Sequence, residues 1–574
     1  MTIRSRPAKA LVWALISASI VLATALTPAH AARVTAPYPP LVVFDGLSPF
    51  VRQFNINQGY GAQPGAVTYA IYEPLYAIDN VQYKQYPWLA TSYTWSKDLK
   101  TLTFTIRHGV RWSDGQPFSA RDVYYTMVTL AKKYPGLPPA GADQLGLWSK
   151  GSLNEATGVS MPAPDKVAIT FKVADVTRFF NVAAFAPLPE HIWSKVKDPM
   201  RWANPDPVAT GPFTRVSNFT AQGFDLNRNP YYWQPGKPAF DTVRVVYFTS
   251  NDAANLAIEA GQVDWGAQAP IPNVAHLYDA RNPNFHHFYC SCYMANNLFL
   301  NLTKYPYNLL AFRQALSMAI NRQVLNTNAD YGFFPPADIQ GVADTTARTG
   351  PYPNWVDKSI PQTLAQYNPA AAKALLLKNG FTYRSSQLYD PRGHRVAFEI
   401  IPTISPVAQA QVMAENFKAI GIDASIKVLQ FSDYLNRLQK GQFDVADGWD
   451  NGGPSPYYYY EPLLSSRAYT PIGTTTPEWN WERWTNPQMD ALFARFRQTN
   501  DAQGQRQLVN QMQRLFVQDL PIIPTTITPI PETYNTTNYT GFPTASDNYA
   551  YGTPFEFGFP IDSLLILNRL RRTH

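Results

Sequence analysis

The sequence predicts an α/β fold with at least two lobes. Its 574 residues are too many for one hydrophobic core, because single cores stop growing near about 250–300 residues. From Val396 to Trp449 the pattern alternates between strand and helix in the order β-α-β-α-β, which builds a parallel sheet. A second stretch, from Thr101 to Lys132, has the pattern of a strand, a turn and a helix, a compact α+β unit.

The N-terminus has the pattern of a secretory signal peptide. Basic residues precede an apolar run, Leu11 to Leu26, which is shorter than the about 20 residues of a membrane helix. Ala29-His30-Ala31 places small residues where signal peptidase cuts. The basic residues are Arg4, Arg6 and Lys9. We therefore expect residues 1–32 to be the signal segment, with the mature chain starting at Ala32 or Arg33; a retained membrane anchor is the alternative.

Export sets further expectations about the mature chain. No cysteine lies near the cleavage site, so we expect a freely diffusing periplasmic monomer and not a lipoprotein. Cleavage would lower the formal charge from +7 to +4. Because Lys and Arg form no clusters, the sequence shows no footprint for nucleic acid.

The strand predicted over Thr101 to Arg107 alternates apolar and polar residues, as a half-buried strand does. A turn follows at Ser113 to Pro117. Ser119 and Asp122 then form a capping-box signature that opens a helix through about Lys132.

The β-α-β-α-β segment divides into five elements. We expect strands at Val396–Pro402, Ala424–Gln430 and Phe443–Trp449. A helix over Val407–Ile420 ends at Gly421, and a shorter one, capped by Ser432, ends at Gly441. Ligands bind beyond the carboxyl ends of parallel strands. That rule indicates Trp449, Asp450 and Asn451.

Two more helices are expected around this sheet. One carries apolar residues from Phe312 to Ala319 at helical spacing. The other opens with Asn368 as its cap and Pro369 in its first turn, and it closes at Gly380.

The two cysteines, Cys290 and Cys292, exclude a scaffold of long-range disulfides. On a strand they would share one face with His286. A closed zinc site needs four ligands, so we expect small, half-buried side chains here, and no metal or cofactor.

Residues 89–127 read LATSYTWSKDLKTLTFTIRHGVRWSDGQPFSARDVYYTM, which closely resembles the signature of the family 5 extracellular solute-binding proteins of ABC importers. Similar segments recur in the same order along nearly the whole mature chain. They are Thr210–Phe213 (TGPF), Asn227–Trp233 (NRNPYYW), Phe312–Arg322 (FRQALSMAINR), Tyr367–Phe381 (YNPAAAKALLLKNGF) and Phe443–Trp449 (FDVADGW).

The resemblance implies a two-lobed periplasmic-binding-protein fold of the cluster C type, with an extra subdomain in the first lobe and a ligand cleft between the lobes. On this basis we expect the first lobe to comprise 33–70, 205–295 and 525–574, its extra subdomain 71–204, and the second lobe 296–524. It also implies that the lobes close on a small ligand and that the closed form is recognised by an ABC permease.

Sugar and peptide remain the two ligand classes. Peptide-binding members commonly place an acid in the loop after the strand that ends at Trp449, whereas here Asp450 follows directly and Gly452 and Gly453 come next. The nearby rings look more like the oligosaccharide-binding branch, because rings stack on sugar faces while amides and carboxylates bind hydroxyls. The predicted ligand-binding residues are Asn57, Trp449, Asp450, Asn451, Tyr457, Tyr459, Trp479 and Trp481. In a strand, the run Tyr457–Tyr460 would send two rings to each face.

A secreted glycoside hydrolase is the rival from another class, and a chaperone-like binding protein is a third possibility. The motifs H-E-x-x-H, G-x-S-x-G and G-x-x-x-x-G-K-[ST] do not occur in the sequence. No acid, base or nucleophile stands out, so we expect binding without catalysis.

Overall fold

The computed structural model describes residues 38–44, 49–56, 68, 70–81, 83–130, 156–199, 201–266, 274–290, 295–342, 355–403, 407–448, 453, 455–476, 479–554 and 562–573. Residues 40–574 form one compact unit. None of the helices in the described part of the chain has the length and apolarity that a membrane crossing requires.

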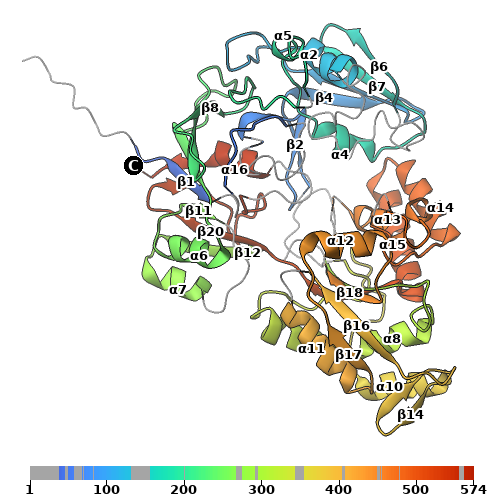
Figure 1. The fold of residues 1–574 in the computed structure, drawn as a ribbon. Helices are drawn as coiled ribbons and strands as arrows, with labels where there is room; N and C mark the ends of the chain where they lie inside the picture. The colour runs from blue at the N-terminus through green and yellow to red at the C-terminus, as the bar shows by residue number, and fades with distance from the viewer. Residues whose placement is uncertain are drawn as a thin grey trace, which may run out of the picture. The chain divides into compact units, whose positions relative to one another are not determined.

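A seven-stranded mixed sheet gathers segments from both ends of the chain (Figure 1). In spatial order its strands are β12 (Phe285–Cys290), β20 (Ile530–Asn535), β11 (Trp265–Gly266), β1 (Leu41–Phe44), β10 (Thr242–Val246), β9 (Gly223–Arg228) and β8 (Phe213–Ser217). Helices α6 (Asn251–Glu259) and α7 (Val274–Arg281) contact each other, and α7 also contacts β12.

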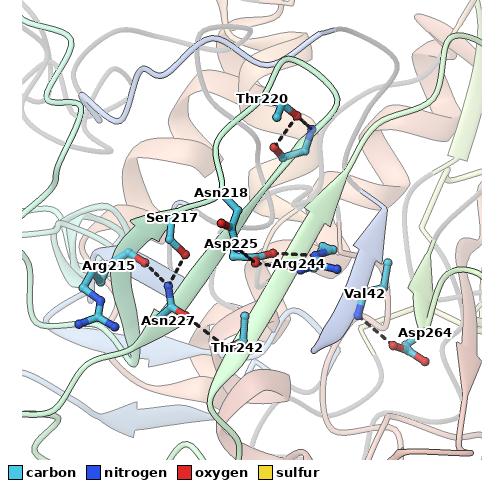
Figure 2. Close-up of polar contacts among 11 residues, drawn as sticks. Val42, Arg215, Ser217, Asn218, Thr220, Asp225, Asn227, Thr242, Arg244 and Asp264 are labelled. Carbon is cyan, nitrogen blue, oxygen red and sulfur yellow. Dashed lines mark hydrogen bonds and ion pairs between the residues drawn. The ribbon is translucent and has the colours of Figure 1, made fainter. Parts of the chain in front are cut away.

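Polar side chains link the strands at the β8 edge of this sheet (Figure 2). Arg244 on β10 donates two hydrogen bonds, of 2.8 and 2.9 Å, to the carboxylate of Asp225, its register partner on β9. Asn227 donates to the Ser217 hydroxyl at 2.8 Å and to the carbonyl of Arg215 at 3.0 Å. The NRNPYYW segment therefore begins with a residue that ties β9 to β8.

A four-stranded antiparallel sheet has its own core. Its strands, in spatial order, are β4 (Ala90–Trp95), β5 (Thr101–Ile106), β7 (Lys166–Phe171) and β6 (Ala156–Ala163). Shorter elements nearby are β2 (Tyr76–Ile78), β3 (Gln85–Pro87), α4 (Arg178–Ala183) and α5 (Glu190–Trp193).

The strand and the cap predicted in this part of the chain are confirmed. Burial alternates along β5, and α2 (Ala120–Tyr124) begins with a complete capping box between Ser119 and Asp122. The helix continues differently from the prediction, because it passes into a π-helical segment, η1 (Tyr125–Leu130). The rest of the predicted helix, up to Lys132, lies outside the described residues.

A five-stranded sheet contains the predicted β-α-β-α-β unit (Figure 1). Its spatial order is β17 (Asp423–Ile426), β16 (Ala397–Pro402), β18 (Val445–Gly448), β13 (Ala295–Leu300) and β19 (Ile522–Ile527). Strand β16 runs parallel to both β17 and β18, as predicted, whereas β13 is antiparallel to its neighbours.

Helices pack against two apolar clusters of this sheet. The first cluster includes residues of α8 (Leu310–Ala319), α10 (Pro369–Lys378) and α11 (Val407–Lys418). The second includes residues of α12 (Phe431–Gln439), α13 (Tyr457–Leu464), α14 (Pro487–Arg497) and α15 (Ala502–Asp519). Small elements complete the fold: α9 (Arg322–Val324), η2 (Leu325–Ala329), β14 (Thr382–Arg384), β15 (Gln387–Tyr389), η3 (Ser466–Ala468), β21 (Tyr539–Thr540), α16 (Asp562–Arg569) and β22 (Arg571–Arg572).

Of the two helix caps predicted near this sheet, one is confirmed and the other is wrong. The side chain of Asn368 caps α10, with Pro369 in the first turn, as predicted. The predicted cap Ser432 lies inside α12, whose first flanking residue is Gln430. The prediction of Ser432 as the cap is wrong, because the helix already begins at Phe431. The side chain of Gln430, which precedes it, makes no capping hydrogen bond.

The chain passes between the five-stranded and the seven-stranded sheets at two places. Strand β12 ends at Cys290 and β13 begins at Ala295; strand β19 ends at Ile527 and β20 begins at Ile530. The side chains of Asn296 and Thr528 join the two crossings, because the Thr528 hydroxyl donates to the Asn296 amide oxygen at 2.8 Å.

Candidate ligand-binding site

The carboxyl end of β18 is where the strand-end rule places a ligand. Strand β18 ends at Gly448, directly before Trp449. Trp449, Asp450, Asn451 and Asn57 all lie outside the described residues, so their ligand-binding role stays a prediction.

The tyrosine run is helical and not a strand. Tyr457 to Tyr460 form the first turn of α13, so the two-per-face expectation does not apply. Tyr457 stacks on Phe496 with ring centroids 4.4 Å apart, and its phenol oxygen accepts a hydrogen bond from Arg497 Nη1 at 3.3 Å. Tyr459 is fully buried and donates through its hydroxyl to Asn297 Oδ1 at 3.2 Å.

The two tryptophans of the predicted site stack on each other. The ring centroids of Trp479 and Trp481 are 4.9 Å apart, and Trp481 meets Phe299 of β13 edge to face at 5.0 Å. Trp481 is buried in the same apolar cluster as Tyr457 and Tyr459, and Trp479 packs against that cluster. The structure therefore brings these four rings to one region beside the five-stranded sheet. Ligand contact by any of them stays a prediction.

A polar cluster near the end of β18 was missed at the sequence level. Asp447 lies on β18 and faces the first apolar cluster, because Val445, two residues earlier, belongs to that cluster. On the same side, Gln409 of α11 donates through Nε2 to both carboxylate oxygens of Asp330, at 2.8 and 2.7 Å. The Gln409 amide also donates to Thr526 Oγ1 of β19 at 3.3 Å.

The backbone at Asp447 is held firmly. Its carbonyl oxygen accepts the Tyr434 hydroxyl at 3.2 Å and the Thr403 amide at 3.0 Å. Its carboxyl oxygens, in contrast, have no hydrogen-bond partner among the described residues. The signal in the sequence is an aspartate two residues before Trp449, within the fully buried strand VADG.

Burial raises the pKa of both carboxyl groups in this cluster. It raises the pKa of Asp330 to about 7, although the bond from Gln409 opposes the shift. It also raises the pKa of Asp447 well above its ordinary value, and the nearby charge of Asp330 raises it further. Within the described residues, neither carboxyl group forms an ion pair with a lysine or arginine. The cluster is therefore a set of acids and amides without a cation.

The cysteine region differs from the prediction. Cys290 is buried at the end of β12, and it is disulfide-bonded rather than a free small side chain. The other cysteine, Cys292, lies outside the described residues. Asn548 donates to Cys290 Sγ at 3.1 Å, and the His286 ring stacks on Tyr534. The described residues contain no group of three or more His, Cys, Asp or Glu that could hold a metal ion.

Surface cavities lie elsewhere in the molecule. One of about 470 Å³ is lined by residues of 107–109 and 233–237, and one of about 610 Å³ by residues of 192–202. None of Tyr457, Tyr459, Trp479 and Trp481, the described residues of the predicted site, lines either cavity. The cavity of about 470 Å³ includes Arg107, directly after β5 of the antiparallel sheet, so the strand-end rule for parallel sheets does not apply there.

Known proteins resemble this chain over most of its length. The sequence is 25% identical over 488 residues to the glutathione-binding protein GsiB of Salmonella choleraesuis, which covers 83% of this chain and 87% of that protein. It is 28% identical over 394 residues to the nickel-binding periplasmic protein of Escherichia coli, covering 65% of this chain and 69% of that protein.

Solved structures share the fold. The periplasmic oligopeptide-binding protein of an ABC transporter from Thermotoga maritima has a TM-score of 0.81 and 22% identity, covering 93% of this chain and 99% of that one. The same protein with mannohexaose bound has a TM-score of 0.73 at 22% identity, covering 94% and 100%. These likenesses confirm the mixed α/β, two-lobed periplasmic-binding-protein fold.

The family itself follows from a match over more than half of the chain. Residues 84–471 match the model of the middle region of the bacterial extracellular solute-binding proteins, family 5. The matched span includes the whole four-stranded sheet and four strands of the five-stranded sheet. The chain belongs to the bacterial extracellular solute-binding proteins of family 5, the solute-capturing subunits of ABC importers.

Proposed function

We propose that this protein captures a short oligosaccharide outside the cytoplasm, closes its two lobes on it, and delivers it to an ABC permease. The observation that carries the sugar assignment is the cluster of Asp330, Gln409 and Asp447 at the end of β18, which has no lysine or arginine partner among the described residues. The stacked tryptophans support it, because Trp481 packs against Phe299 of the same sheet. Sugars offer hydroxyl groups that donate and accept hydrogen bonds, together with apolar faces that stack on rings.

The bound mannohexaose of the Thermotoga maritima protein supports this assignment, since a closely similar fold holds a hexasaccharide. Closure requires that the ligand bind the closed state more tightly than the open one. The family points to transport and not to catalysis, so we infer that the ligand leaves the cleft unaltered.

Calorimetry tests the ligand class. We expect binding of at least one member of a panel of cello-, xylo- and manno-oligosaccharides, and none of a mixed pool of tri- to pentapeptides. Trp449→Ala should weaken sugar binding by about 1–3 kcal/mol, the scale for burying a large apolar side chain. Asp450→Asn should matter less, because sugars bring no ammonium group. Tight peptide binding that is lost in Asp450→Asn, with no response to any sugar, would establish the peptide alternative instead.

We infer that the protein reaches its compartment through a cleaved signal peptide and works there as a periplasmic monomer without a lipid anchor. The family consists of extracellular solute-binding proteins, which supports export. Intact-mass measurement of protein from the periplasmic fraction should give a chain starting at Ala32 or Arg33. Size-exclusion chromatography with light scattering should give a single subunit. An uncleaved chain in the membrane fraction would contradict the assignment.

A further inference from the structure

Three buried side-chain oxygen atoms near the end of β18 make no hydrogen bond with the described residues. They are Oδ1 and Oδ2 of Asp447 and Oε1 of Gln409, and none has a donor among the described residues. Both side chains are fully buried. Gln409 directs its amide nitrogen at Asp330 and Thr526, so its oxygen is the unused part of the group.

Unsatisfied buried acceptors are costly, and each one calls for a missing donor such as a ligand or a water molecule. Glu482, next to Trp481 of the second apolar cluster, shows the contrast. Its carboxyl oxygens also lack hydrogen-bond partners among the described residues, and burial raises its pKa well above the ordinary value, but the neighbouring Arg483 guanidinium opposes this shift. Among the described residues, Asp447 has no such cation, and its charged neighbour is the acid Asp330.

The position of Asp447 favours a ligand as the missing donor. The residue is the last but one of β18, at the strand end where ligands of parallel sheets bind. Its backbone is fixed by Tyr434 and Thr403, so the carboxyl group is held in one place. The group is shielded in this structure, and hinged two-lobed proteins open to admit their ligands.

We propose that Asp447 and Gln409 form an acceptor subsite for neighbouring hydroxyl groups of one sugar residue. This proposal rests on the proposed function and assigns its specificity. The carboxyl group of Asp447 exchanges hydrogen bonds with adjacent hydroxyls, which both donate and accept, and Gln409 Oε1 accepts a further one. Asp330 positions Gln409, because both of its carboxylate oxygens accept hydrogen bonds from the Gln409 amide nitrogen.

The test compares Asp447→Asn with Glu482→Gln by calorimetry on cello-, xylo- and mannohexaose. Both changes replace a buried, unpartnered carboxyl group by an amide of the same shape, but only the first lies at the strand end. We expect Asp447→Asn to weaken binding of the sugar that the unaltered protein takes up by about tenfold or more, and Glu482→Gln to leave it within about twofold. Circular dichroism checks folding, and Asp447→Ser, which lacks the second oxygen, serves if the asparagine variant misfolds.

The outcomes separate this proposal from the proposed function. If the unaltered protein binds a sugar and Asp447→Asn binds it equally well, the acceptor subsite is wrong, a buried water molecule satisfies the carboxyl group, and the importer function stands. If the unaltered protein binds peptides and no sugar, the ligand class is wrong and the hydroxyl subsite falls with it.

Discussion

Glu73 is a buried carboxyl group that aromatic side chains hold by hydrogen bonds. The indole of Trp88 donates to it at 2.6 Å, the hydroxyl of Tyr232 at 2.9 Å, and the indole of Trp233 at 3.1 and 3.2 Å. Tyr232 and Trp233 close the NRNPYYW segment, so part of the aromatic excess serves the fold and not a ligand. Burial outweighs the donors and raises the pKa of Glu73 to about 7.

Glu73 should make the protein less stable as the pH rises from about 4.5 to 7. In this window the folded protein keeps a proton that the unfolded chain has lost, so the free energy of unfolding falls with pH. The shift corresponds to about 3 kcal/mol across the window. Urea denaturation as a function of pH should show a flatter decline for Glu73→Gln than for the unaltered protein.

Asp264→Asn offers a matched comparison for this measurement. Burial raises the pKa of Asp264 to about 6, so its own contribution is lost at lower pH than that of Glu73. Identical pH profiles for Glu73→Gln and the unaltered protein would show that Glu73 is not protonated in the folded state.

Gly211, in the TGPF segment, leaves no room for a side chain. An added Cβ would lie 2.4 Å from the carbonyl oxygens of both Ala70 and Ile71, which are backbone atoms that cannot rotate away. Gly211→Ala should therefore lower the free energy of unfolding by about 1–3 kcal/mol or more.

Gly158 of β6 is the control for this substitution, because an added Cβ meets nothing within 4 Å there. Gly158→Ala should be neutral or slightly stabilising, since glycine inside a strand costs about 0.5–1 kcal/mol relative to alanine. Thermal denaturation of the two variants compares them directly, and similar melting temperatures would argue against the close approach at Gly211.

Among the helices and strands, the sequence predicted those whose period persists over a long segment. Strands β16, β17 and β18 and helix α11 could be located because each keeps one apolar face over several residues. The tyrosine run could not be assigned, since four identical residues carry no period, and Pro462 inside α13 is itself unfavourable to a helix. The π-helical continuation of α2 follows from packing that no local pattern encodes.

Mutation of the observed cap Asn368 and of the wrongly predicted cap Ser432 compares the two residues at this scale. The Asn368 side chain accepts a hydrogen bond from the Ala371 amide at 2.9 Å, so Asn368→Ala should cost about 1 kcal/mol. Ser432→Ala should change the stability by less than about 0.5 kcal/mol, because Ser432 is an exposed residue inside α12. Chemical denaturation of both variants decides the matter, and a larger loss for Ser432→Ala would restore the cap that the sequence suggested.

In the whole molecule, distant segments meet in ways that only the folded chain reveals. The sequence predicted lobes built from interleaved segments, and the two sheets do exchange the chain at β12–β13 and β19–β20; the exact domain boundaries stay predictions. The cluster of Asp330, Gln409 and Asp447 could not be predicted. Its members come from the end of η2, from α11 and from β18, and their proximity depends on how these elements pack. The strand-end rule indicated the end of β18, where Asp447 lies, but it could not indicate the residues of the other two elements.

Arg322, the last residue of FRQALSMAINR, ties three such segments together. The buried guanidinium donates to the carbonyl oxygens of Ser317 at 3.0 Å, Ala365 at 2.9 Å and Pro524 at 2.7 Å. These acceptors belong to α8, to the loop before α10, and to β19, the strand that leads into the seven-stranded sheet. The burial lowers the pKa of Arg322 to about 9, which leaves it charged at neutral pH.

Arg322→Lys should destabilise the whole protein although it keeps the charge. A lysine carries its donors on one nitrogen and cannot span carbonyls that the planar guanidinium reaches from several nitrogens. At least one buried acceptor is then left without a donor, and we expect a loss of about 3 kcal/mol in the free energy of unfolding, measured by urea denaturation. Arg506→Lys, on an exposed position of α15, should change it by less than about 0.5 kcal/mol. If both variants unfold at the same urea concentration, the guanidinium is not what fastens β19 to α8, and the stability of the crossing strand must come from its apolar contacts alone.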